Sequence, residues 1–176
     1  MIIYYLRMGI NMWGNTHGGT NVTTVVPFDD TNLARAALVR ATEVSDASEE
    51  VVALTVIPTD DREYARERGW LGPDEAFDTE TIVTRLSETV EQLAPGATFE
   101  YTCVGRYAPP GQIANEVRTY AHERGARMIV IGSDSAGRIA STLGSIGRVV
   151  AANGQYDTLI VRSQSTTERE IPPASP

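Results

Sequence analysis

The sequence predicts an α/β protein of three layers, in which helices cover both faces of an open, doubly wound sheet of five parallel strands. Two observations lead to this fold class. Apolar runs alternate along the chain with segments whose apolar residues recur at helical spacing, which is typical of strand, helix and strand units with right-handed crossovers. Several runs are continuously apolar, as expected of parallel strands buried on both faces. With 176 residues, 41% of them hydrophobic, we expect one domain with a substantial core.

The first strand, the first helix and the second strand are predicted in the first third of the chain. The β-branched run VTTVV ends at Pro27, which favours a strand that stops there. Thr31 or Asn32 can cap the helix that follows. The apolar residues of this helix share one face: Leu33, Ala34, Ala37, Leu38 and Ala41. The run EVVALTVIP, residues 50–58, predicts the second strand.

The middle of the chain predicts a second amphipathic helix and a third strand. Residues 59–78 are rich in charged side chains and contain Gly69, Gly72 and Pro73, which interrupt regular structure. We interpret the segment as a long connection, or excursion, that contains some helix. Helical spacing resumes with Ile82, Leu86, Val90 and Leu93 and stops at Pro95 and Gly96. The run TFEYTCV, residues 98–104, predicts the third strand. We expect its Cys103, the single cysteine of the chain, to be a small buried hydrophobe.

The last third of the chain predicts two more helices and two more strands. After Pro109, Pro110 and Gly111, one helical face is formed by Ile113, Val117, Tyr120 and Ala121. The run RMIVIG, residues 127–132, predicts the fourth strand. A helix marked by Ile146, Val149 and Val150 then leads to the fifth strand, DTLIVR.

The two ends of the chain differ from the rest in composition. We predict an N-terminal arm over residues 1–21, either flexible or an extension before the true start, one domain over 22–163, and a disordered tail over 164–176. The arm lacks the apolar region and cleavage pattern of a signal peptide. No run reaches the roughly 20 apolar residues of a membrane span. These features predict a cytoplasmic protein that does not bind membranes.

Composition argues against several functions. The net charge of −8 excludes a nonspecific nucleic-acid binder, which needs clustered positive charge. All 15 basic side chains are arginine, so a phosphate loop or Schiff base that depends on lysine is excluded in its usual form. His17 and His122 are far apart and have no partner at ligand spacing, so we expect no metal site. An acidic composition without lysine is typical of a halophilic archaeon, whose cytoplasm has a high salt concentration. It is equally expected of a GC-rich genome that encodes its basic residues as arginine, and both interpretations stay open.

The loop after the fourth strand combines small residues with glycines. In doubly wound sheets, ligands bind beyond the carboxyl ends of the strands where the strand order reverses. Gly132 ends the fourth strand, and Gly144 and Ser145 start the next helix, whose free amides and dipole can bind phosphate without lysine. The loop is therefore either an anion cradle or an ordinary connection rich in turn-forming residues.

Ordered blocks of the sequence resemble the universal stress protein family. TTVVPFDD followed by NLARAALVRA is similar to the family's first strand, turn and helix, and VVALTVIP is similar to its second strand. GQIANEVRTYAHERGARMIVIGS and LGSIGRVVAANGQYDTLIVR resemble its last two helices, each with the strand that follows. The resemblance covers about four-fifths of the chain, from Val22 to Arg162. It implies a Rossmann-like fold, similar to the adenine-nucleotide α-hydrolases, with strand order 3-2-1-4-5.

The glycine loop matches the family pattern in part. Members that bind ATP carry a glycine, two residues, a second glycine, nine residues, and then Gly-Ser or Gly-Thr. Gly132 matches the first glycine, and Gly144 with Ser145 matches the last pair. Ser135 stands in place of the second glycine, Gly137 follows two places later, and the interval from the first glycine to the last is one residue shorter. This places the sequence between the ATP-binding and nucleotide-free branches, nearer the first.

The resemblance implies which residues contact a nucleotide. Pro27 and Asp29 match turn residues beside adenine and ribose, and Val56 matches a residue that packs on adenine. Phe28 stands where threonine is more common, so it either narrows the pocket or stacks beside it. Asp29 also has a simpler reading as a charge that flanks the following helix. The remaining predicted contacts lie near the nucleoside or the phosphates: Ile131, Gly132, Ser135, Gly137, Gly144, Ser145 and Ile146.

The predicted function is that of a small dimeric stress-response protein that binds ATP, alone or with Mg²⁺, or a related adenine nucleotide. No catalytic residue is predicted, because the sequence offers no Ser/His/Asp set and no Asp-x-Asp with a later lysine. We expect weak ATP hydrolysis at most. The alternative is a nucleotide-independent dimer that acts as a protein-interaction module. The resemblance implies a homodimer through the last strand, Thr158 to Arg162, which would cover an apolar sheet edge, and a protein partner of unknown identity.

Overall fold

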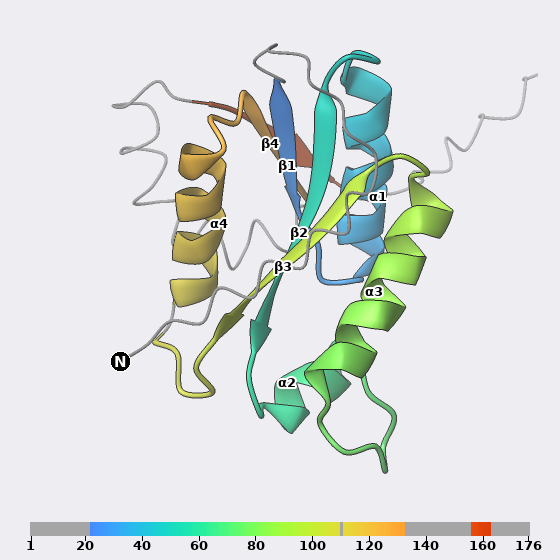
Figure 1. Cartoon of the computed structure of the whole chain (residues 1–176), viewed down its shortest axis with the longest axis vertical. Helices are drawn as coiled ribbons and strands as arrows, with labels where there is room; N and C mark the ends of the chain where they lie inside the picture. The colour runs from blue at the N-terminus through green and yellow to red at the C-terminus, as the bar shows by residue number, and fades with distance from the viewer. Residues whose placement is uncertain (1–21, 110, 133–155, 163–176) are drawn as a thin grey trace, which may run out of the picture.

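The computed structural model describes residues 22–109, 111–132 and 156–162 of the chain. Within them, five parallel strands form one sheet in the order β3-β2-β1-β4-β5 (Figure 1), so the predicted fold class and strand order are confirmed. The strands are β1 (Thr23–Pro27), β2 (Glu50–Pro58), β3 (Thr98–Val104), β4 (Met128–Gly132) and β5 (Asp157–Val161). The described helices are α1 (Asn32–Val44), α2 (Arg62–Glu67), α3 (Thr79–Leu93) and α4 (Gln112–Glu123). The predicted arm, tail and last helix lie outside the described residues.

Two hydrophobic clusters sandwich the sheet. One cluster lies beneath α1, α2 and α3 and includes the fully buried side chains of Val26, Leu38 and Ile82. The other lies on the opposite face beneath α4 and includes Val25 and Ile129. Figure 1 shows α1 and α3 on one side of the strands and α4 on the other. The central strands β1 and β2 are covered on both faces, which explains their continuously apolar sequences.

Helix α1 begins as its sequence predicts. Thr31 is the N-cap, and its hydroxyl accepts a hydrogen bond from the amide of Ala34 at 3.3 Å. The five residues of the predicted apolar face are those that the helix buries. Helix α3 buries three of its four predicted residues, and Leu93 is partly buried.

Helix α4 differs slightly from the prediction. Ala114, Val117 and Ala121 are its buried residues, whereas Ile113 and Tyr120 are partly buried at the edge of the cluster. The helix thus turns a smaller residue, Ala114, toward the sheet than the apolar spacing predicted. A small side chain allows the helix axis to approach the strands closely.

The prediction for Cys103 is wrong, because this residue is exposed. It lies on β3, which has a strand neighbour on one side only within the described sheet. Its partly buried neighbours Phe99 and Tyr101 pack against the core, while Cys103 lies near the end of the strand. At a sheet edge, an apolar run is only partly covered, so burial cannot be inferred from the run alone.

The opposite edge of the sheet is also exposed. All residues of β5 are partly buried or exposed, and the side chain of Ile160 has a relative exposure of 44%. A groove of about 990 Å³ runs between this strand and α1 and is lined by apolar residues such as Val39 and Leu159. In the described part of the chain, no helix is both long enough and apolar enough to span a bilayer.

Candidate functional site

The strand order reverses between β1 and β4. The connections from β1 to β2 and on to β3 extend the sheet in one direction, whereas β4 and β5 extend it in the other. Ligands of doubly wound sheets bind at such a reversal, beyond the carboxyl ends of the strands. Here those ends are Pro27 and Gly132, two of the predicted site residues.

The β1–α1 turn, residues Phe28 to Thr31, follows β1 at this reversal. The amide of Phe28 donates to the carbonyl of Leu54 at 2.8 Å, and the Thr55 hydroxyl donates to the carbonyl of Phe28 at 2.7 Å. The Phe28 side chain is buried in the cluster beneath α1, α2 and α3. The turn is thereby anchored to β2, and Phe28 is a core residue. A role for it beside a ligand stays a prediction.

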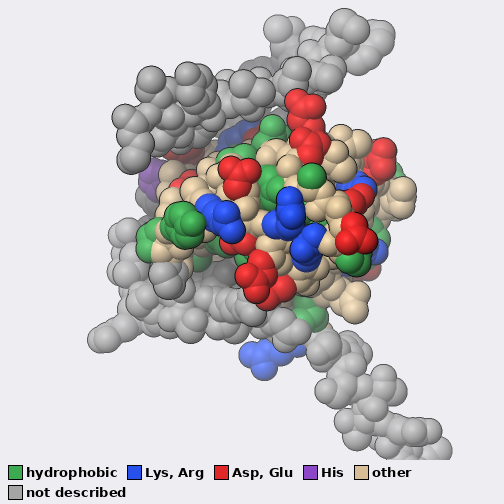
Figure 2. All heavy atoms as spheres, turned by 90° about the horizontal axis from the view of Figure 1, so that it is seen from below, with side chains coloured by type: hydrophobic (Ala, Val, Ile, Leu, Met, Phe, Trp, Pro, Cys, Tyr) green, Lys and Arg blue, Asp and Glu red, His purple; other side chains and the backbone are tan. Residues whose placement is uncertain are grey.

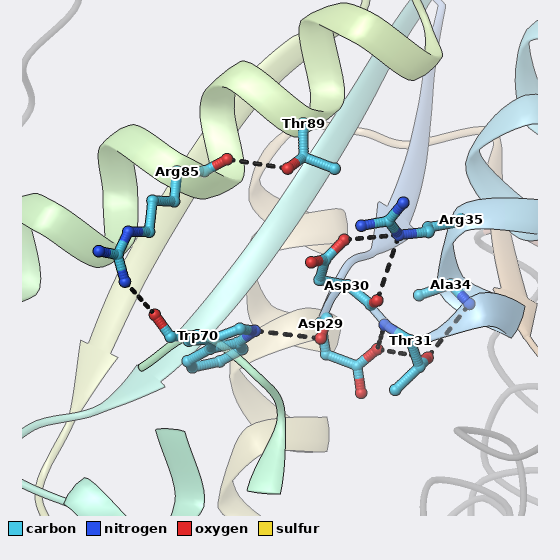
Figure 3. Close-up of polar contacts among 8 residues, drawn as sticks. All are labelled: Asp29, Asp30, Thr31, Ala34, Arg35, Trp70, Arg85 and Thr89. Atoms are coloured by element: carbon cyan, nitrogen blue, oxygen red, sulfur yellow. Dashed lines mark hydrogen bonds and ion pairs between the residues drawn. The ribbon is translucent and has the colours of Figure 1, made fainter. Parts of the chain in front are cut away.

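The carboxylate of Asp29 accepts hydrogen bonds from Thr31 and pairs with Arg68. Its Oδ1 accepts from the Thr31 hydroxyl at 2.7 Å and from the Thr31 amide at 3.3 Å (Figure 3). Its Oδ2 is paired with the guanidinium of Arg68. The side chain keeps a relative exposure of 19%. A charged acceptor is thus held at the start of α1, where the helix dipole favours negative charge, and remains accessible.

Asp30 gives the turn its shape. Its φ of 64° lies in the left-handed region, which aspartate tolerates better than most residues. Its Oδ1 accepts from Nε of Arg35 on α1 at 2.8 Å, and its carbonyl accepts from the same nitrogen at 3.4 Å (Figure 3). This ion pair fastens the turn to its own helix. It does not involve Asp29.

The segment after α2 contacts the turn from the other side. Trp70, which is buried, donates from its indole Nε1 to the carbonyl of Asp29 at 3.1 Å (Figure 3). The carbonyl of Trp70 in turn accepts from Arg85 of α3 at 3.0 Å. Sequence reasoning missed both Arg68 and Trp70, since residues 59–78 were interpreted only as an excursion. A tryptophan flanked by Gly69 and Leu71 in a charged segment was the one available signal.

Gly132 allows β4 to meet α1. A Cβ at this position would lie 2.6 Å from the carbonyl carbon of Leu33 and 2.7 Å from its oxygen. Real Cβ atoms do not approach backbone so closely, so only glycine fits here. The close approach predicted for a ligand at Gly132 is made, in the described structure, by the first turn of the protein's own helix.

The other predicted site residues divide between the sheet faces and the part of the chain outside the described residues. Val56 and Ile131 are buried in the cluster beneath α4, on the face opposite to Phe28. The structure therefore brings Val56 and Ile131 into one cluster, and places Asp29 and Gly132 at the start of α1. Five predicted residues lie outside the described ranges: Ser135, Gly137, Gly144, Ser145 and Ile146.

The described surface carries charges of both signs. Seen from the end of the molecule where α2 lies, arginine and acidic side chains are interspersed (Figure 2). Among the described residues, no group of three or more His, Cys, Asp or Glu is arranged to hold a metal ion. The chemistry that the described residues offer at the reversal of the strand order is hydrogen bonding to one held carboxylate, beside the ends of β1 and β4.

These features define an α/β protein of the doubly wound class, with its strand order reversing between β1 and β4. Residues 22–162 match the model of the universal stress protein family, and the chain belongs to this family. No curated protein matches the chain.

Several solved structures are similar to the chain. A universal stress protein in complex with cAMP is 24% identical, covers 81% of this chain and 98% of its own, and has a TM-score of 0.47. A universal stress protein from Archaeoglobus fulgidus in complex with dAMP is 17% identical, with coverages of 80% and 95% and a TM-score of 0.42. A family member from Burkholderia pseudomallei is 19% identical, with coverages of 82% and 98% and a TM-score of 0.43.

Proposed function

We propose that this universal stress protein binds ATP or a related adenine nucleotide at the reversal of the strand order between β1 and β4. The observation that carries the proposal is the Asp29 carboxylate, which is held at the reversal of the strand order and is still accessible. A fixed carboxylate in this position suits the hydroxyl groups of a ribose, which are hydrogen-bond donors. The family's glycine pattern, matched in part by Gly132, Gly144 and Ser145, supports a phosphate site in the following loop.

The roles of individual residues follow from this proposal. Pro27 and Asp29 lie beside the nucleoside, and Val56 and Ile131 contribute apolar surface to the adenine. Gly137, Gly144, Ser145 and Ile146, together with Ser135, contact the phosphates through backbone amides and hydroxyls. Mg²⁺ would then be held mainly by the phosphates, since the described residues offer no carboxylate cluster for it.

Calorimetry with ATP, with and without Mg²⁺, tests the proposal in a buffer of high potassium concentration. Mass spectrometry of the purified protein first shows whether a nucleotide was carried through purification.

Asp29→Asn should weaken ATP binding by about tenfold or more, because a hydrogen bond to a charged acceptor is lost. Asp60→Asn is the matched control, since Asp60 occupies the corresponding turn after β2 and asparagine tolerates its φ of 58°. Absence of binding and of any bound nucleotide would instead favour a nucleotide-independent interaction module.

We also propose that two copies of the chain pair through β5, from Thr158 to Arg162. Within the described sheet, β5 has a strand neighbour on one side only, and Ile160 is an exposed apolar residue on it. An edge of this kind is usually covered, and a two-fold copy would cover it with the same surface. Analytical ultracentrifugation should find a dimer that Ile160→Lys shifts toward monomer, whereas an unshifted dimer would contradict pairing through this strand.

A further inference from the structure

Arg68 joins a segment distant in sequence to the candidate site. It is the C-cap residue of α2, 39 positions after Asp29, and its guanidinium pairs with Oδ2 of that carboxylate. We propose that Arg68 is a positioning residue for ribose recognition: it fixes the Asp29 carboxylate so that it accepts a hydrogen bond from a ribose hydroxyl group. This inference rests on the proposed binding of an adenine nucleotide.

The Asp29 carboxylate is held at both oxygens. Thr31 engages Oδ1 through its hydroxyl and its amide, and Arg68 engages Oδ2. A carboxylate offers about four acceptor directions. Thr31 takes two of these directions and Arg68 takes one at Oδ2, while the side chain keeps a relative exposure of 19%. Without Arg68, the carboxylate would keep its contacts to Thr31 but lose the partner that orients Oδ2.

Arg68 is itself held in place. Its guanidinium carbon lies 5.0 Å from the ring centroid of Tyr64, at a distance typical of a cation–π contact. Tyr64 meets Trp70 edge to face, with centroids 5.5 Å apart, and Trp70 donates to the Asp29 carbonyl. The Arg68 side chain has a relative exposure of only 15%. These contacts form a closed ring through Asp29, Arg68, Tyr64 and Trp70, so Arg68 is part of a fixed arrangement.

The chemistry of arginine suits this task. A planar guanidinium directs several N–H donors in fixed directions, so it orients a carboxylate, whereas a lysine ammonium acts as a point charge. The ligands that benefit are nucleotides that keep the ribose hydroxyl group from which Asp29 accepts. A purely structural Arg68 would stabilise the fold without affecting the choice between ribose and deoxyribose.

The same turn offers a matched control. Arg35 pairs with Asp30 at 2.8 Å and has a relative side-chain exposure of 42%. Arg35→Gln therefore removes an arginine–aspartate pair from the turn without removing a partner of Asp29. Arg68→Gln and Arg68→Lys remove the fixed donors from Asp29.

The experiment measures the affinities of the native protein and these variants for ATP, 2′-deoxy-ATP and 3′-deoxy-ATP by calorimetry, after circular dichroism has shown that each variant is folded. The native protein should prefer ATP over at least one deoxy analogue by about tenfold. Arg68→Gln should reduce this preference to about twofold or less by weakening ATP binding alone. Arg35→Gln should keep the native preference.

Three other results would overturn the assignment in different ways. A native preference retained in Arg68→Gln, or equal binding of ATP and both analogues by the native protein, would overturn the role of Arg68 and leave nucleotide binding intact. Failure of the native protein to bind ATP would overturn the proposed function and this inference with it. If Arg68→Gln does not fold, Arg68→Lys decides, because the preference should fall by about threefold in it and an unchanged preference would overturn the assignment.

Discussion

The turns after β1 and β2 are built from the same parts. Each strand ends in a proline, Pro27 or Pro58. Each turn contains an aspartate with positive φ, 64° at Asp30 and 58° at Asp60. Each then has a polar N-cap whose side chain accepts from an amide of the following helix. Both turns therefore start a helix by the same local chemistry.

The two turns differ in length by one residue, and they lie at different places in the sheet. The turn after β1 has an additional residue, Asp29, between the proline and the left-handed aspartate. The carboxylate of that residue is held by Thr31 and Arg68. This turn also lies where the strand order reverses, whereas the turn after β2 lies between strands added in the same direction. A turn becomes a candidate site when an accessible, fixed polar group lies where the strand order reverses.

The largest expected effect on stability comes from replacing Gly132, which allows β4 to pack closely against the first turn of α1. Gly132→Ala should destabilise the protein by about 2 to 3 kcal/mol, because the new Cβ would overlap the backbone of Leu33 at 2.6 Å. Urea unfolding measures the change. Gly105→Ala is the control, because a Cβ there meets no atom within 4 Å, and it should change stability by less than about 0.5 kcal/mol. Equal stability of the two variants would contradict the close packing of β4 against α1.

A smaller effect is expected from the two N-caps. Thr31→Ala and Asp61→Ala should each cost about 1 kcal/mol in unfolding free energy, because each removes the acceptor of a helix amide. Only Thr31→Ala also removes a partner of the Asp29 carboxylate, so it alone should weaken ATP binding, by about fivefold. Urea unfolding and calorimetry on the same samples separate the two effects. Equal ATP affinities of both variants would mean that the turns do not differ in function.

The elements of the fold were predictable because their signals are local. The buried face of α1 follows from apolar spacing, and the bounds of β2, Glu50–Pro58, follow from a continuous apolar run that ends in proline. The left-handed conformation of Asp30 was not predicted. It depends on a turn shape that several sequences can adopt.

The composition of the site was predicted only in part. Asp29 and Gly132 were found through their place at strand ends and through a family pattern. Arg68 and Trp70 were missed because they contact Asp29 from 39 and 41 positions further along the chain. The periodic spacing of apolar residues does not indicate contacts between residues so far apart in sequence. The exposure of Cys103 was missed for a similar reason, since it depends on which strand lies at the edge of the sheet.

The smallest expected effect concerns the segment that brings Trp70 and Arg68 to the first turn. Glu75 in this segment accepts from both terminal nitrogens of Arg85, at 2.6 and 2.7 Å, and from the amide of Gly72 at 2.7 Å. The hydrogen bond from Arg85 is the main reason why the pKa of Glu75 is lowered from 4.5 to about 2. Because the folded pKa is the lower one, the stability from this carboxylate is present above pH 4.5 and is lost as the pH falls toward 2. Glu75→Gln should therefore flatten the decline of stability in this window.

At neutral pH, Glu75→Gln should cost less than either cap variant, because both side chains of the pair with Arg85 are partly exposed to water. Urea unfolding at several pH values between 7 and 2 gives both results in one series. Glu67→Gln, at an exposed carboxylate on α2 that is not part of this ion pair, is the matched control. A curve for Glu75→Gln that declines as steeply as the native one would show that the segment is held to α3 by its apolar contacts and by the hydrogen bond from Arg85 to the Trp70 carbonyl, without the ion pair. The orientation of Arg68 toward Asp29 would then depend on Tyr64 and Trp70 and not on this ion pair.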